Sequence, residues 1–224
     1  MGETLATGLS GPRRLLAGAL RDLVIGMTVV CADGVVARSG GRVVEKVAGY
    51  GSSMKHFDRT MAEAGESRRR VERARAISAK VVDLAEYLVD LGPHAKRHPL
   101  PLHVAYHDAC HLSHGQGVTS QPRKLFAPIP DLKVSDLPNK EICCGSAGVY
   151  NLFRPEAAAE SGERKGQDVA STGARVLVSG NPGCSLQIAS AMERAGSSMA
   201  ITHTAQILDA SLRGLSVDRL LGRG

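Results

Sequence analysis

Four cysteines of this 224-residue chain could bind one metal centre between them. Cys143 and Cys144 are adjacent, while Cys110 and Cys184 lie on either side of the pair, each about one βα unit away. Thiolate sulfur is the usual ligand of iron-sulfur clusters and of structural zinc, and four thiolates satisfy either centre. The residue types and their number therefore predict a metal centre held by Cys110, Cys143, Cys144 and Cys184.

Glycine accompanies each cysteine segment. Gly145 follows the adjacent pair, Gly183 precedes the last cysteine, and Gly115 and Gly117 follow the first one. Glycine tolerates positive φ and leaves room for a close approach of the backbone. We expect these residues to let the chain wrap around a bulky inorganic group.

The residues Asn181-Pro182-Gly183 predict that Cys184 opens a helix. Backbone amides at a helix N-terminus favour a thiolate, and they could donate hydrogen bonds to cluster sulfurs. Cys184 is therefore expected to be the ligand with the strongest local electrostatic support.

Three histidines flank the first cysteine: His107, His111 and His114. An imidazole there could ligate iron, move a proton or donate to a cluster sulfur. We expect a supporting role in the loop for these histidines, with Asp108 fixing the tautomer of one of them.

Three other interpretations of the cysteines stay open. Each could be an ordinary buried thiol, although the adjacent pair and the glycines favour a metal site. Zinc is the alternative metal, and the chain would then be a zinc-stabilised or apo interaction module, but zinc sites usually take ligands in close C-x-x-C pairs. A disulfide between Cys143 and Cys144 is disfavoured, because adjacent cysteines form a strained ring. Cys31 has none of the accompanying features, and we expect it to be a core thiol.

Short apolar runs alternate with helical segments in the second half of the chain. We expect strands at 102–106, 132–137, 175–179 and 199–202, and helices at 120–127, 155–172, 184–194 and 203–213. This alternation predicts a short parallel sheet with crossover helices, an α/β Rossmann-like three-layer domain. Loops at the carboxyl ends of parallel strands meet in one crevice, so the cysteine loops would converge there.

The first half is less regular. An amphipathic pattern from Val71 to Leu91 predicts a helix that ends at Gly92-Pro93, followed by a proline-rich linker. We divide the chain into an unassigned segment at 1–54, the helix and linker at 55–101, and the metal-binding domain at 102–224. The apolar run at 23–32 is about half the length of a membrane span and is interpreted as a buried strand.

The formal charge of +6 raises the question of nucleic-acid binding. The densest basic cluster, between Arg68 and Arg75, alternates with glutamates and contains no aromatic residue that could stack on a base. We interpret it as a solvated helix face, do not expect nucleic acid as a partner, and leave an acidic protein partner open.

Five cysteines, two of them adjacent, fit thiolate ligands in a reducing cytoplasm better than a disulfide framework.

Several motifs resemble the cysteine-rich CCG domain that is shared by the glycolate oxidase iron-sulfur subunit, lactate-utilisation iron-sulfur proteins and a subunit of heterodisulfide reductase. They are Tyr106-His-Asp-Ala-Cys-His-Leu112, His114-Gly-Gln-Gly117, Gln121-Pro-Arg123, Cys143-Cys-Gly-Ser-Ala-Gly148, Tyr150-Asn-Leu152 and Gly180-Asn-Pro-Gly-Cys184. The glycolate oxidase branch is the most similar. The resemblance implies a 4Fe-4S type cluster on the four cysteines and an electron-transfer role beside a flavoprotein that oxidises a 2-hydroxy acid. It also implies a ferredoxin-like iron-sulfur chain as a further partner, in the cytoplasm or peripherally at the inner face of the membrane.

The chain departs from the family pattern in three places. Cys184 is followed by Ser185-Leu186-Gln187, without the second cysteine of C-x-x-C. The segment Ala48-Gly-Tyr-Gly-Ser52 is similar to the end of an upstream CCG domain with Tyr50 in place of a cysteine, so residues 1–54 are interpreted as its remnant. A ferredoxin-like cysteine run and a nucleotide-binding G-x-G-x-x-G motif are both missing, so catalysis by this chain alone is not expected.

Overall fold

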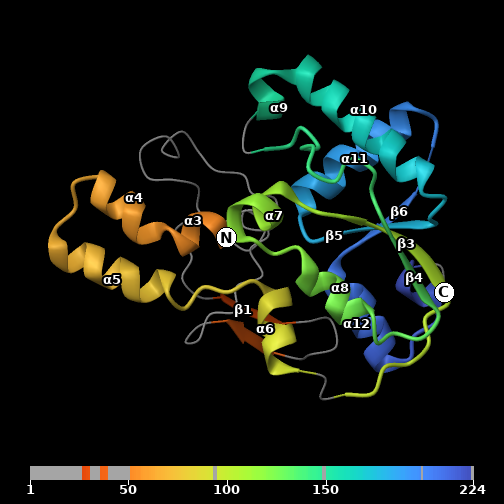
Figure 1. Ribbon diagram of the computed structural model, residues 1–224, viewed down its shortest axis with the longest axis horizontal. Helices are drawn as coiled ribbons and strands as arrows, with labels where there is room; N and C mark the ends of the chain where they lie inside the picture. The colour runs from red at the N-terminus through yellow and green to blue at the C-terminus, as the bar shows by residue number, and fades with distance from the viewer. Residues whose placement is uncertain are drawn as a thin grey trace. The chain divides into compact units, whose positions relative to one another are not determined.

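The computed structural model describes residues 27–30, 36–39, 51–92, 95–147, 150–197 and 199–222 (Figure 1). The chain forms two compact units, one made of Met1–Glu45 with Ser53–Val82 and the other of Lys46–Ser52 with Asp83–Gly224. Cys31, Tyr50 and residues 1–26 lie outside the described residues, and so do the expectations that concern them.

The first unit contains a strand pair and two helices. Strands β1 (Met27–Val30) and β2 (Val36–Ser39) are antiparallel, and β1 falls within the apolar run for which a strand was expected. Helices α4 (Phe57–Glu63) and α5 (Arg68–Ser78) follow α3 (Gly51–Lys55). On α5, Arg68 and Arg70 form exposed ion pairs with Glu72 and Glu66, as expected of a solvated helix face.

The expectation of one continuous helical pattern up to Gly92 was wrong in one respect. Helix α5 ends at Ser78, and a separate helix, α6 (Leu84–Leu91), begins after Asp83. The Asp83 carboxylate accepts from the amide of Ala85, and Glu86 accepts from the amide of Asp83, so a capping box starts a new helix there. Gly92, at φ 80°, ends it as predicted.

The second unit contains a four-stranded parallel sheet in the order β4-β3-β5-β6. The strands are β3 (Leu102–His107), β4 (Leu132–Asp136), β5 (Val176–Ser179) and β6 (Ala200–Thr202). All four match expected strands to within one residue at each end. The predicted α/β class and the parallel sheet are confirmed.

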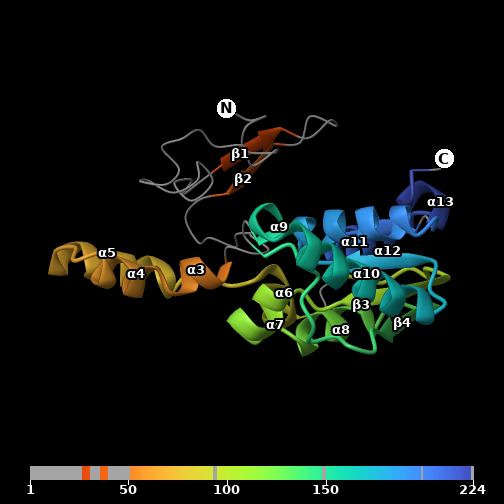
Figure 2. The same cartoon turned by 90° about the horizontal axis from the view of Figure 1, so that it is seen from above.

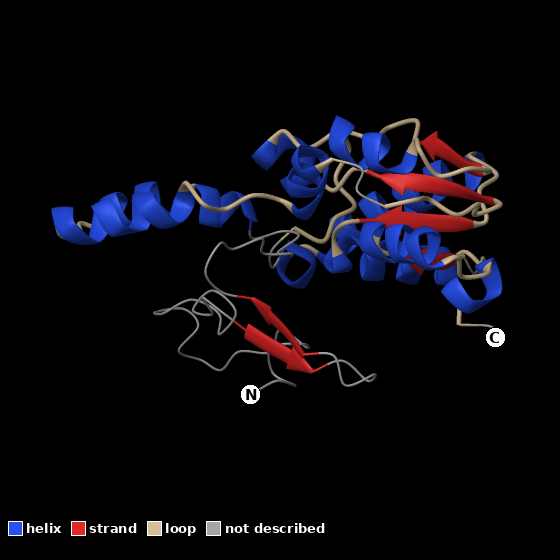
Figure 3. Ribbon diagram, turned by 90° about the horizontal axis from the view of Figure 1, so that it is seen from below, coloured by secondary structure: helices blue, strands red, loops and turns tan. Residues whose placement is uncertain are grey.

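Helices follow every strand of this sheet. They are α7 (Cys110–Gln116) and α8 (Ser120–Phe126), α9 (Tyr150–Phe153) and α10 (Pro155–Ser171), α11 (Pro182–Arg194), α12 (Thr204–Arg213) and α13 (Val217–Leu220). Helices α10 and α11 pack side by side (Figure 2), while α8 contacts both α6 and α12. Figure 3 shows helices on both sides of the sheet, which makes the fold three-layered.

The strand order creates a crevice between β3 and β5. The chain leaves β3 for β4 on one side and then returns past β3 to β5 on the other. Because parallel crossovers are right-handed, connections in opposite directions lie on opposite faces of the sheet. The loops after β3 and β5 therefore diverge, and a crevice opens between them at the carboxyl ends of these two strands.

The core around this crevice is mainly aliphatic, in keeping with an aromatic content of only 3%. Strands β3 and β5 carry Val104, Val176 and Val178, all of which are fully buried. Their apolar residues face both helical layers, as is usual for central parallel strands. Tyr106 and Phe126 form an edge-on aromatic pair within this core, with ring centroids 5.9 Å apart.

Candidate metal centre

The end of β3 positions the first group of candidate ligands. His107 is the last residue of the strand, Ala109 is the N-cap, and Cys110 is the first residue of α7. The expectation that Cys110 lies in a loop was wrong, because Cys110 begins helix α7 directly after a short turn. The half-buried Cys110 side chain is thereby fixed on a regular element.

The two glycines that follow Cys110 serve α7 and do not wrap the centre. Gly117 is the left-handed C-cap of the helix, and a β-carbon at Gly115 would meet Ser52 at 2.9 Å. The expected role of these two residues was therefore wrong, because the segment after Cys110 is helical.

Gly145 shapes the segment that carries the adjacent cysteines. It has φ 90°, and a β-carbon there would lie 2.5 Å from the carbonyl oxygen of Ala158 on α10. Its amide lies 3.4 Å from the sulfur of Cys143 and donates to it. The turn brings half-buried Cys143 and buried Cys144 onto the crevice, and only glycine fits at the point of close approach.

Cys184 lies in the first turn of α11, as predicted. The side chain of Asn181 is the N-cap and accepts from the amide of Gly183 at 2.9 Å. A β-carbon at Gly183 would meet the hydroxyl of Ser146 at 3.2 Å, so this helix end lies close to the segment that carries Cys143 and Cys144.

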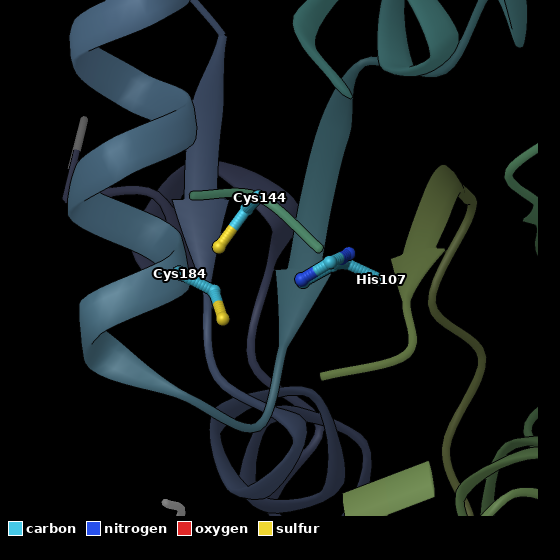
Figure 4. Close-up of side chains that lie close together, drawn as sticks. All are labelled: His107, Cys144 and Cys184. Atoms are coloured by element: carbon cyan, nitrogen blue, oxygen red, sulfur yellow. The ribbon is translucent and has the colours of Figure 1, made fainter. Parts of the chain in front are cut away.

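The four sulfurs converge. The sulfurs of Cys110 and Cys143 are 3.9 Å apart. One ligand atom from each of His107, Cys144 and Cys184 lies within 4.8 Å of the other two, and Figure 4 shows the imidazole facing the two thiols. All four cysteines are free thiols. Three connections far apart in the sequence thus deliver soft ligands to one place.

Contacts among the four thiols lower the pKa values of two of them and raise those of the other two. Contact with the Cys110 thiol lowers the pKa of Cys143, and contact with the Cys144 thiol lowers the pKa of Cys184 to about 5. The pKa of Cys110 and that of Cys144 are raised, chiefly by their contacts with the sulfur of Cys143 and then by burial; for Cys144, contact with Cys184 also contributes. A bound cation would favour ionisation of all four thiols.

His107 has a special position in the cluster. It is 1% exposed and lies beside the Cys184 thiol, whose pKa it lowers, but neither ring nitrogen makes a well-aligned hydrogen bond among the described residues. Leaving a buried polar group unpaired costs about 1–3 kcal/mol. An imidazole that is unpaired beside two thiols fits a site built to receive a metal centre.

The other predicted supporting residues have different partners. His111 contacts the Ser52 hydroxyl at 3.3 Å, and exposed His114 lies 3.4 Å from the carbonyl oxygen of Glu141. Both carboxylate oxygens of Asp108 accept from Arg123, where a histidine was expected. These side chains support the β3–α7 connection and lie outside the cluster of sulfurs.

Sequence reasoning missed Lys165 as a residue of the site. This lysine is fully buried on α10, and its ammonium donates to the carbonyl oxygen of Asn139, shortly before the adjacent cysteines. The signal was the helical spacing of Ala158, Gly162, Lys165 and Val169, which places the lysine on a face of small and apolar residues.

Comparison with known proteins agrees with this geometry. Residues 104–189 match the family model described as "Cysteine-rich domain", CCG. This segment is similar to CCG domains. It includes all four cysteines and His107, and it ends within α11.

Curated relatives carry related names. The chain is 32% identical over 170 residues to a probable glycolate oxidase iron-sulfur subunit of Bacillus subtilis, an alignment covering 74% of this chain and 38% of the relative. It is 32% identical over 139 residues to lactate utilization protein A of Oceanobacillus iheyensis, covering 62% of this chain and 57% of the relative. It is 33% identical over 120 residues to a fumarate reductase (CoM/CoB) subunit of Methanothermobacter marburgensis, covering 54% and 24%.

The chain thus spans between about a quarter and somewhat over half of the length of these relatives. The recognition of a CCG domain from its motifs is confirmed. Across the described ranges, each helix is too short or too polar to traverse a lipid bilayer.

Proposed function

We propose that this chain is an iron-sulfur electron-transfer subunit, or part of one, in which Cys110, Cys143, Cys144 and Cys184 hold a 4Fe-4S type cluster. The observation that carries the proposal is the convergence of four free thiols from three connections on one crevice. The iron-sulfur name of the Bacillus subtilis relative supports it.

The donor set fits such a group. Thiolates are soft ligands that favour iron-sulfur clusters and zinc over hard cations such as magnesium. When bound, an iron-sulfur cluster supplies one-electron redox chemistry. The chain's own residues hold and shield it: Cys144 and Cys184 lie on the buried side, and the Gly145 amide donates to the sulfur of Cys143.

The half-exposed side of the centre, at Cys110 and Cys143, is where we place electron exchange. As donor we propose a flavin-containing dehydrogenase subunit that oxidises a 2-hydroxy acid of the glycolate or lactate kind, in keeping with the names of two relatives. A ferredoxin-like iron-sulfur chain is proposed as a second redox partner.

We assign residues 102–224 to the iron-sulfur domain, 55–101 to a helical segment and linker, and 1–54 to the remnant of an upstream CCG domain.

Metal analysis of anaerobically purified protein tests the proposal. We expect iron and acid-labile sulfide, a brown colour and visible absorbance that dithionite bleaches. Cys144→Ala should abolish the absorbance, and Cys31→Ser is the matched control because Cys31 lies outside the segment 104–189 that matches the family model. Wild-type protein without iron and sulfide would refute the proposal.

A structural zinc site is the second candidate, and one distance favours it. The 3.9 Å between the sulfurs of Cys110 and Cys143 is close to the edge of a zinc tetrahedron, about 3.8 Å for Zn–S bonds of about 2.3 Å. About one equivalent of zinc with negligible iron and sulfide would assign the chain to a zinc-stabilised interaction module.

A further inference from the structure

A fully buried lysine lies beside the segment that carries Cys143 and Cys144. The ammonium of Lys165 donates to the carbonyl oxygen of Asn139 at 2.5 Å. Its nearest carboxylate, that of Asp168, is 3.8 Å away and accepts from the Asn139 side-chain amide at 2.8 Å. These three residues join α10 to the segment that precedes the cysteines.

The helix face that carries Lys165 lies against this segment. A β-carbon at Gly162, one turn earlier, would lie 3.6 Å from the carbonyl oxygen of Cys144, and Gly145 closely approaches Ala158 on the same face. The close backbone contact requires small residues at these positions. Lys165 is the long, charged exception on this face.

The local partners of Lys165 compensate its charge incompletely. An ammonium has three donors, and among the described residues it makes one close hydrogen bond and one loose ion pair. Burial lowers the pKa of Lys165, while electrostatic interactions with Asp168, Cys144, Glu141 and Cys143 raise it. Two of these four groups are cysteines of the candidate metal centre.

We propose that Lys165 is an electrostatic tuning residue, whose buried positive charge raises the reduction potential of the metal centre on Cys110, Cys143, Cys144 and Cys184. The inference rests on the proposed function. One-electron reduction adds one negative charge to the centre, and a nearby buried cation stabilises that form more than the oxidised form. The field acts without any contact between the lysine and the centre.

The test is a reductive titration of the loaded full-length protein with dithionite, followed by visible absorbance and electron paramagnetic resonance. In Lys165→Met, the ratio of reduced to oxidised protein at the wild-type midpoint should fall about tenfold, a shift of about 59 mV to lower potential for a one-electron couple. Lys165→Arg keeps the charge and should stay near the wild-type value.

Two further variants distinguish an electrostatic effect of Lys165 on the reduction potential from structural damage caused by replacing it. Asp168→Asn removes a negative charge but keeps an oxygen that can accept from Asn139, so it should shift the potential upward. Lys140→Met removes an exposed positive charge from the same segment and should change the potential less than Lys165→Met, since water and salt screen it.

Opposite shifts in Lys165→Met and Asp168→Asn support the inference. Shifts in the same direction, or unchanged potentials in both, would overturn it while the proposed function stands. If Lys165→Met does not retain iron, Asp168→Asn decides alone: an upward shift supports the inference, and any other result overturns it. Wild-type protein that binds no redox-active iron would overturn the proposed function and this inference together.

Discussion

The guanidinium of Arg123 holds both carboxylate oxygens of Asp108, at 2.9 and 2.6 Å. Asp108 is 6% exposed and lies between His107 and Cys110, so this ion pair fixes the connection that carries two groups of the centre. The same guanidinium contacts the Asp136 carboxylate and the face of Tyr106. Strands β3 and β4 and helix α8 are joined at this point.

Replacing Arg123 by Gln should therefore destabilise the protein and loosen the β3–α7 connection. Loss of one partner leaves the Asp108 carboxylate buried without its cation, which costs about 3 kcal/mol. Urea denaturation of the metal-free protein measures this. Arg164→Gln is the control, because its ion pair with Glu160 is exposed and should contribute less than about 1 kcal/mol. Equal effects in the two variants would rule out a special role for Arg123.

Gly145→Ala should prevent formation of the centre. The residue would need φ 90° and a β-carbon 2.5 Å from the Ala158 carbonyl oxygen, a combination that we expect to cost about 3 kcal/mol. Gly173→Ala separates the two causes, since Gly173 has φ 65° with no atom within 4 Å of the added carbon, and should cost about 1 kcal/mol. Denaturation midpoints and metal content of both variants check the prediction, which a normal metal content in Gly145→Ala would contradict.

His107→Leu should affect the metal-free and the loaded protein in opposite directions. Removing the unpaired ring nitrogens from a buried position should raise the free energy of unfolding of the metal-free protein by about 1–2 kcal/mol. The same change should weaken metal retention about 10- to 100-fold, measured by competition with a chelator. His114→Leu, at an exposed position on α7, should alter neither quantity much. A His107→Leu variant that is less stable without metal would show that the imidazole has a structural role.

The stability of the metal-free protein should depend on the Cys184 thiolate. Its folded-state pKa of about 5 is lower than the value of about 8.5 for an unfolded thiol. The resulting stabilisation is complete above the unfolded value and disappears as the pH falls through about 5, with a slope of up to about 1.4 kcal/mol per pH unit. Urea midpoints between pH 9 and pH 4 should therefore fall more steeply for the wild type than for Cys184→Ser, whose hydroxyl does not ionise in that range. Parallel profiles would contradict the prediction.

The strands and most helices of the second unit could be predicted from local pattern alone. The apolar runs at β3 and β5 are bounded by turn residues, and Asn181-Pro182-Gly183 marks the start of α11 in any context. The crossing order of the connections then brings the cysteines to one edge of the sheet. This step required only the general geometry of parallel sheets.

Features that depend on tertiary contacts could not be predicted in the same way. Helix α7 carries polar residues and glycine in place of an apolar stripe, so its sequence resembles a loop. Asp108 and Arg123 meet only because α8 lies beside the end of β3, and Lys165 reaches the carbonyl oxygen of Asn139 only because that segment lies opposite α10. Sequence patterns report which faces are apolar, whereas these pairings depend on what lies opposite each face.

The adjacent cysteines also have a consequence for folding. A centre bound to Cys110, Cys143, Cys144 and Cys184 would act as a cross-link, closing one loop between the first two cysteines and another between the last two. Each closure of this length removes about 3–4 kcal/mol of chain entropy from the unfolded state, if it constrains the chain as a disulfide does. Binding of the metal centre would then stabilise three connections of the sheet at once. Loss of the centre on exposure to oxygen would leave a chain that proteases cleave more easily.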